Sequence, residues 1–212
     1  MKDDYKVVFI NRYYCPDQSA TSQILTDLCN ELAAHGHEVE VICSNQRIDD
    51  PQARLPAAEV LGGVRIHRVW TSCFGRERLG GRLLDYLTFY LSAAACLWRL
   101  LRAGDVVVAK TDPPLISVIV TPIAWVRRAA VVNWLQDLFP EVAVQTHVRF
   151  LAGPVGRVLT AFRNWSLRQA VTNVAIGQKM SDLLDGQQIP RHSIRVLPNW
   201  ANGSEIYPVA PS

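Results

Sequence analysis

The sequence has few charged residues, no strong surplus of one charge and no long hydrophobic run. Charged side chains make up 19% of its 212 residues, too few for a disordered or coiled-coil chain. The net charge of +3 is too small a surplus to indicate a nucleic-acid-binding protein, so we expect no nucleic acid partner. No apolar stretch reaches the ~20 residues that a membrane-spanning helix needs.

Several catalytic and metal-binding motifs are also missing. The five cysteines are widely spaced without a Cys-x-x-Cys pair, which predicts free thiols in a reducing cytoplasm rather than a zinc ribbon or redox motif. No histidine pair has credible metal spacing with a carboxylate, so we expect no metal. The chain lacks the Gly-x-Ser-x-Gly elbow of α/β-hydrolases and the Walker P-loop, which disfavours both classes.

Apolar runs of strand length alternate with amphipathic stretches of helix length along almost the whole chain. Strands are predicted at 7–11, 39–43, 64–70, 105–109, 130–135, 171–176 and 194–197. Helices are predicted between Ser19 and Gly36 and at 82–102, 113–128, 154–169 and 178–184, with a long surface loop at 46–61. This order predicts an α/β fold, a Rossmann-like parallel sheet with helices on both faces, over residues 1–200.

The loop after the first predicted strand lacks the Gly-x-Gly-x-x-Gly fingerprint of dinucleotide-binding domains. Tyr14, Cys15 and Pro16 replace the glycines, which disfavours a nicotinamide-dependent dehydrogenase. The helix that starts near Ser19 still presents free backbone N–H groups to a phosphate, although a simple capped helix is the alternative. We therefore predict substrate contacts for three polar residues at this helix start, Asp17, Ser19 and Thr21.

Polar residues also follow two later strands, at the edge where open parallel sheets bind ligands. Gln136, Asp137 and Glu141 follow the 130–135 strand, and we predict that the two carboxylates accept sugar hydroxyls or stabilise positive charge. A solvated turn capped by Asp137 is the alternative. Lys110, after the 105–109 strand, would meet a phosphate.

Two further residues complete the predicted substrate-binding set. Asp112 follows Lys110 and precedes two prolines, and its alternative role is to cap the next helix. Asn199 follows the last strand and would face an interdomain cleft, although it is equally explained as a turn residue.

The helix predicted at 82–102 is apolar nearly all round, with basic residues before its start and at its end. One side must pack on the sheet, which leaves a second apolar side. We predict that this region contacts a membrane interface through Arg76, Arg78, Arg82, Tyr86 and Tyr90. The alternatives are a core helix buried on two faces and a dimer interface.

Seven segments occur in the order seen in the retaining GT-B glycosyltransferases of family 4. They are VVFINRYYCPD, AHGHEVEV, GVRIHRV, LGGRLLDYLTF, TDPPL, QDLFPEVAV and VLPNW. The chain most resembles the bacterial polysaccharide subgroup, which builds lipid-linked or exported sugars. The first loop departs from the family because it is not glycine-rich, and Gln136-Asp137 stands where many members have a histidine.

The resemblance implies the N-terminal, acceptor-side half of a two-domain enzyme. The C-terminal donor-binding domain would be absent, and residues 201–212 would begin the interdomain linker. The expected reaction moves a sugar, with retention, from a nucleotide-sugar to a polyprenyl-phosphate-linked or saccharide acceptor. The nucleotide-sugar is a substrate, so no cofactor is expected, and Asp137 and Glu141 would be catalytic.

The expected location is cytoplasmic, peripheral on the inner face of the membrane. One alternative is a truncated or non-catalytic membrane-docking half that needs a separate donor-binding partner. A different Rossmann-type nucleotide binder is a further alternative, which the missing glycine fingerprint disfavours.

Overall fold

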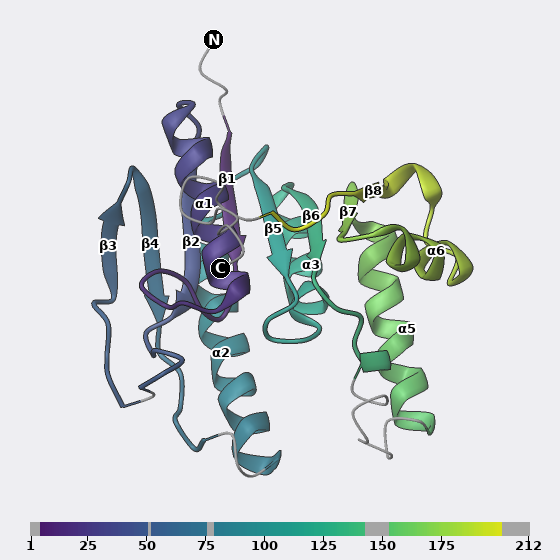
Figure 1. Cartoon of the computed structure of the whole chain (residues 1–212), viewed down its shortest axis with the longest axis horizontal. Helices are drawn as coiled ribbons and strands as arrows, with labels where there is room; N and C mark the ends of the chain where they lie inside the picture. The colour runs from purple at the N-terminus through teal and green to yellow at the C-terminus, as the bar shows by residue number, and fades with distance from the viewer. Residues whose placement is uncertain (1–4, 51, 76–78, 143–152, 201–212) are drawn as a thin grey trace, which may run out of the picture.

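A computed structural model describes residues 5–50, 52–75, 79–142 and 153–200, which form an eight-stranded sheet with helices on both faces (Figure 1). The strands are β1 (Lys6–Ile10), β2 (Glu38–Ser44), β3 (Ala58–Leu61), β4 (Val64–Val69), β5 (Val106–Lys110), β6 (Ala130–Leu135), β7 (Thr172–Ala175) and β8 (Ile194–Val196). The helices are α1 (Ala20–Ala34), α2 (Leu79–Leu100), α3 (Ile116–Arg127), α5 (Pro154–Gln169) and α6 (Gln178–Gly186), with a 3-10 turn at Arg191–Ser193.

The strand order is β3-β4-β2-β1-β5-β6-β7-β8, and every neighbouring pair is parallel except β3 with β4. The chain leaves β1 towards β2 and later returns to the other side of β1 through β5. This reversal makes the β1–β5 boundary the switch point at which doubly wound sheets bind ligands. The predicted α/β, Rossmann-like architecture is confirmed.

Alternating side chains of the central strands point into two separate cores. Phe9, Val41 and Val108 pack under α1, whereas Val8, Ile42 and Val107 pack under α2 and α3. Because both faces of these strands are covered, they are continuous apolar runs rather than alternating ones. A third core, which includes Leu167 and Leu184, joins α5 and α6 to the β6–β8 end of the sheet.

The expectation of a loop across 46–61 is wrong at its end, because Ala58–Leu61 forms edge strand β3. It pairs antiparallel with β4 across a two-residue turn, Gly62-Gly63. Both glycines have positive φ, 56° and 83°, the geometry that the tightest hairpins need and that glycine adopts without strain. Most of β3 is exposed, so its side chains lack the apolar pattern that marks the inner strands.

The predicted start of the third helix at Pro113 is also wrong, because α3 begins at Ile116. Its N-cap is Leu115, at φ 62°, and no side chain caps it. Asp112 therefore does not cap the helix. Asp112 and Pro113 each precede a proline, and a residue before proline is held out of the α conformation, so the helix begins only after the second proline.

Candidate functional site

The loops that follow β1, β5 and β6 and the last residue of β2 are joined to one another at the carboxyl ends of the strands. The backbone N–H of Arg12 donates to the Asp112 carbonyl at 2.7 Å, and the Ser44 N–H donates to the Arg12 carbonyl at 2.9 Å. The Gln136 N–H donates to Thr111 Oγ1 at 3.3 Å. These bonds hold the carboxyl-terminal ends of four strands together at the switch point.

Buried polar atoms without a hydrogen-bond partner gather at this edge. In the described part of the chain they belong to Asn11, Arg12, Asp17, Ser22, Asn45, Arg47, Arg68, Asn133, Trp134 and Gln136. Each lies in the second half of a strand, in the loop beyond it or in the first turn of α1. Folded domains usually satisfy such groups internally, so their concentration here marks the edge as a ligand-binding candidate.

A pocket opens at the ends of β5 and β6, on the side covered by α3 and α5. Its polar lining comes from Lys110, Thr111, Ser117, Asn133, Asp137 and Arg163. Partial burial raises the pKa of Asp137, and a hydrogen bond with the Thr111 side chain opposes the rise. Asn133 is fully buried; its Nδ2 donates to Asn173 Oδ1 at 2.9 Å, while its Oδ1 has no partner.

Glu141 lies in the same loop as Asp137, but its carboxylate is already engaged. Arg163 Nη2 donates to Glu141 Oε1 at 3.0 Å, and Gln187 Nε2 donates to the same oxygen at 2.9 Å. Burial would raise the pKa of Glu141, but the hydrogen bonds from Arg163 and Gln187 outweigh it and lower the pKa. The geometry is that of a carboxylate fixing the loop to α5, and a catalytic Glu141 stays a prediction.

The residues predicted to meet a phosphate lie on the opposite side of the sheet, under α1. The ammonium group of Lys110 donates to the Thr21 carbonyl at 3.0 Å and lies 4.0 Å from the centre of the Trp134 ring. Burial lowers the pKa of Lys110 to about 8, against the opposing charges of Cys29 and Asp112. Ser19 caps α1, its Oγ accepting from the Ser22 N–H at 3.3 Å.

Two of the predicted residues from distant loops are brought together. Asn199 Nδ2 donates to Gln136 Oε1 at 2.9 Å, which ties the segment after β8 to the loop after β6. Nearby, the Trp200 ring stacks on Trp134 with 5.7 Å between centroids. Asp17 lies elsewhere, in the loop before α1, where its buried Oδ1 accepts from the Ile48 N–H at 2.7 Å.

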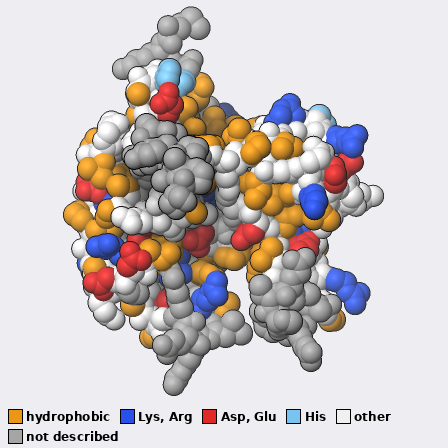
Figure 2. All heavy atoms as spheres, viewed as in Figure 1, with side chains coloured by type: hydrophobic (Ala, Val, Ile, Leu, Met, Phe, Trp, Pro, Cys, Tyr) orange, Lys and Arg blue, Asp and Glu red, His pale blue; other side chains and the backbone are white. Residues whose placement is uncertain are grey.

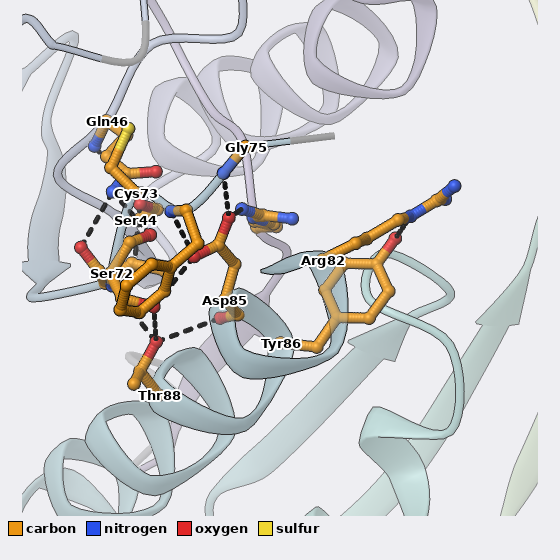
Figure 3. Close-up of polar contacts among 12 residues, drawn as sticks. Ser44, Gln46, Ser72, Cys73, Gly75, Arg82, Asp85, Tyr86 and Thr88 are labelled. Carbon is orange, nitrogen blue, oxygen red and sulfur yellow. Dashed lines mark hydrogen bonds and ion pairs between the residues drawn. The ribbon is translucent and has the colours of Figure 1, made fainter. Parts of the chain in front are cut away.

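The predicted membrane-contact residues divide into three situations. Arg76 and Arg78 lie outside the described residues. Arg82 is exposed at the start of α2, with its Nε donating to Tyr86 Oη at 2.9 Å (Figure 3). Tyr90 packs against the core under α2 and donates from its hydroxyl to the Pro114 carbonyl, so its ring faces the protein.

The alternative of an α2 buried on two faces is wrong, because five of its large apolar side chains are exposed.

No helix in the described residues combines the length and hydropathy that a bilayer crossing needs. Those residues also contain no cluster of three or more potential metal ligands. On the face seen in Figure 2, basic and acidic side chains are interspersed among hydrophobic ones.

Four polar pocket residues were not predicted from the sequence, namely Thr111, Ser117, Asn133 and Arg163. Thr111 stands between Lys110 and Asp112, whose charges are the stronger sequence signal. Asn133 interrupts the apolar strand β6, which was a usable signal for a polar site. Arg163 lies on a helix among other basic residues, and nothing in its local pattern distinguishes it as the buried one.

A mostly parallel sheet with its candidate pocket beyond the strand ends defines a Rossmann-like domain of the kind found in GT-B glycosyltransferases. The structure resembles sucrose-phosphate synthase from Thermosynechococcus elongatus, at TM-score 0.63 and 13% identity, covering 97% of this chain and 51% of that one. It also resembles Anabaena HepE in complex with UDP and glucose, at TM-score 0.54 and 15% identity, covering 94% and 46%.

A third similar structure is α,α-trehalose 6-phosphate synthase from Burkholderia multivorans, at TM-score 0.51 and 13% identity, covering 86% of this chain and 42% of that one. The chain thus spans about half the length of these enzymes, and the likeness concerns the fold. No curated protein matches the sequence. The model of the glycosyl transferase 4-like domain family matches residues 20–200, and the chain belongs to this family.

Proposed function

We propose that this chain is the acceptor-side domain of a retaining glycosyltransferase that moves a sugar from a nucleotide-sugar to a lipid-linked acceptor. The reaction would serve polysaccharide or glycoconjugate assembly at the cytoplasmic face of the membrane. Membership of the glycosyl transferase 4-like family supports the transferase class. The binding of UDP-glucose by Anabaena HepE supports a nucleotide-sugar donor.

The observation that carries the proposal is the position of Asp137. Its carboxylate lies at the end of β6, in a pocket beside the switch point, and partial burial raises its pKa. A carboxylate held there would accept a hydrogen bond from a sugar hydroxyl or stabilise positive charge that develops on the sugar ring. The unpaired Oδ1 of Asn133 would accept from a second hydroxyl.

The test is sugar transfer from a panel of nucleotide-sugars to a polyprenyl-phosphate-linked sugar in lipid vesicles. We expect Asp137→Asn to lower turnover by about 100-fold or more, since removal of a preorganised electrostatic group has effects of this order. Asp182→Asn, an exposed carboxylate on α6, is the matched control and should transfer at the rate of the unchanged protein. Equal rates for Asp137→Asn and the unchanged protein would remove Asp137 from the reaction.

A second candidate is a non-catalytic, membrane-docking half that works with a separate donor-binding protein. The observation in its favour is that one side of α2 exposes five large apolar side chains. Calorimetry with nucleotide-sugars and a polyprenyl phosphate, with and without vesicles, separates the two. Lipid-dependent acceptor binding without sugar transfer in the assay above would favour the second candidate, whereas sugar transfer by the chain would contradict it.

A further inference from the structure

The outward side of α2 is a continuous apolar face over about four turns. Its members are large apolar side chains between 47% and 64% exposed, namely Leu83, Leu84, Leu87, Leu91 and Trp98. Their spacing places them on one side of the helix, opposite the buried Phe89, Ala93 and Leu97. We refer to these five exposed residues as the α2 face. In Figure 1 the first turns of α2 extend past the ends of β1 and β5.

The loop between β4 and α2 displays two more aromatic side chains, Trp70 at 60% exposure and Phe74 at 67%. The loop backbone is fixed from both sides. Gln46 Nε2 donates to the carbonyls of Thr71 and Ser72 at 2.7 and 2.9 Å. The Ser72 N–H donates to Thr88 Oγ1 at 3.0 Å. Exposed aromatic rings on a restrained loop lose little conformational entropy when they bind.

Asp85 provides the strongest of these restraints (Figure 3). Its Oδ1 accepts from Ser72 Oγ at 2.7 Å and from the Phe74 N–H at 2.9 Å, and its Oδ2 accepts from the Gly75 N–H at 3.2 Å. The carboxylate is buried, and its nearest cation, Arg12, is 4.0 Å away. Asp85 is therefore committed to holding the loop on α2.

Phe74 borders the α2 face directly. A Cβ atom at Gly81 would lie 3.1 Å from both Phe74 Cβ and the Phe74 carbonyl oxygen, so the loop packs against the first turn of the helix. Leu84 follows Gly81 by three residues and lies on the same side of α2. The ring of Phe74 thus extends the apolar surface from the helix onto the loop.

The charges around this surface favour an anionic lipid surface over a second copy of the chain as its binding partner. Among the described residues, the exposed charged ones at the two ends of α2 are all basic, Arg82, Arg99 and Arg102, and the only acidic residue of the helix is the buried Asp85. A second copy of the chain packed on this face would bring arginine towards arginine. An anionic lipid surface complements both the apolar face and its basic ends.

We propose that the α2 face, extended by Phe74, docks onto the interface of an anionic lipid bilayer, and that Asp85 is the positioning residue for Phe74. This surface rests on the proposed function, because it would carry the pocket at the strand ends to a lipid-linked acceptor. The leucines and Phe74 enter the headgroup boundary, and the arginines at the helix ends meet lipid phosphates.

Flotation with phosphatidylcholine vesicles, with and without phosphatidylglycerol, tests the docking surface. The unchanged chain should bind the anionic vesicles, and Leu87→Gln/Leu91→Gln should weaken binding at least tenfold. The matched control is Val158→Gln/Phe162→Gln on α5, where the two side chains are 53% and 54% exposed against 51% and 64% on α2. Equal losses in both double variants, or no loss in the α2 variant, would overturn the proposal.

A second copy as occupant predicts a different result. Sedimentation equilibrium would then show a dimer that the α2 double variant loses, without vesicle binding by the unchanged chain, and this outcome also overturns the proposal. Circular dichroism melts establish that each variant is folded before binding is compared.

The role of Asp85 is tested by non-additivity. Phe74→Ala and Asp85→Asn should each weaken vesicle binding by a factor of a few, and the double variant should be no weaker than Phe74→Ala alone. Additive losses would show that Asp85 acts without Phe74. The vesicle-binding assay contains no sugar substrate, so it is independent of the sugar-transfer assay. Vesicle binding without sugar transfer would contradict the proposed function and still support the docking surface. Transfer without vesicle binding would do the reverse.

Discussion

Buried polar groups are paired at the end of the sheet where the strands begin and lack partners at the end where the strands finish. At the edge where the strands begin, Lys6 Nζ lies 3.2 Å from Glu40 Oε1, and His67 Nε2 lies 2.9 Å from the other oxygen of that carboxylate. Asp105 accepts from the backbone N–H groups of Lys6 and Arg102. At the edge where the strands end, the buried polar atoms without partners are gathered instead.

This difference separates the part of the domain that provides stability from the part that is available for binding. A paired buried charge is costly to break, because the remaining partner is left without compensation. An unpaired buried polar atom already carries its desolvation cost in the folded state, so its removal costs little. Substitutions at the first edge should therefore unfold the domain, and those at the second should leave it folded.

The largest effect is expected for Glu40→Gln at the paired edge. Lys6 is 5% exposed and would lose its only carboxylate partner among the described residues, so we expect a loss of about 3–5 kcal/mol in the free energy of unfolding. Urea unfolding followed by circular dichroism measures it. Glu38→Gln, an exposed partner of Arg65, is the control and should cost less than about 1 kcal/mol.

The second prediction concerns acid. Burial would raise the pKa of Glu40, but the hydrogen bond from His67, the charge of Lys6 and the hydrogen bonds from Arg65 and Lys6 outweigh it and lower the pKa from 4.5 to about 2. The stabilisation is therefore fully present above pH 4.5 and is lost as the pH falls towards about 2. Urea unfolding across this range should show the loss in the unchanged chain. A Glu40→Gln variant with the same acid dependence would contradict the assignment.

The third prediction moves to the other edge, where Asp17→Asn should not destabilise the chain. Burial raises the pKa of Asp17 above its usual 3.8, so its ionised form costs stability as the pH rises through that range and at neutral pH. We expect unfolding at pH 7 to become harder by up to about 1 kcal/mol, because the amide oxygen still accepts from Ile48. A loss of more than about 1 kcal/mol in the free energy of unfolding would mean that the ionised carboxylate of Asp17 stabilises the fold.

The last prediction concerns the pH dependence of stability in the Lys110→Met variant. Burial lowers the pKa of Lys110 from 10.5 to about 8, so between these values the unfolded chain holds a proton that the folded chain has lost. Stability contributed by this group therefore rises with pH across that interval. Thermal unfolding of the methionine variant at a series of pH values should lack that rise. An equal rise in both proteins would contradict burial as the cause.

Most of the fold was predictable because local patterns carry it. The inner strands are apolar runs and α5 is amphipathic, and the prediction of residues 154–169 coincides with the helix. The misses have physical reasons. Strand β3 is exposed and lacks an apolar pattern, and α3 starts late because two successive prolines hold the residues before them out of the helix.

The sequence predicted the location of the candidate site but not the orientation of its side chains. Parallel strands bring their carboxyl ends to one edge, and Lys110, Asp112, Gln136 and Asp137 lie at or just beyond the ends of β5 and β6, while their roles stay predictions. Which side of the sheet each side chain takes was not predictable from position after a strand. Lys110 turns under α1, whereas Asp137 enters the pocket on the α3 side with the unpredicted Asn133.

By itself the sequence determined the alternation of strands and helices, and with it the parallel sheet and its ligand-binding edge, because periodicity and turn residues act over a few neighbours. Only the tertiary structure decided that Glu141 is bound by Arg163, that Asp85 holds the loop that displays Phe74, and that one side of α2 stays exposed. These three features depend on packing between segments far apart in the chain, and such contacts cannot be read from the local sequence pattern.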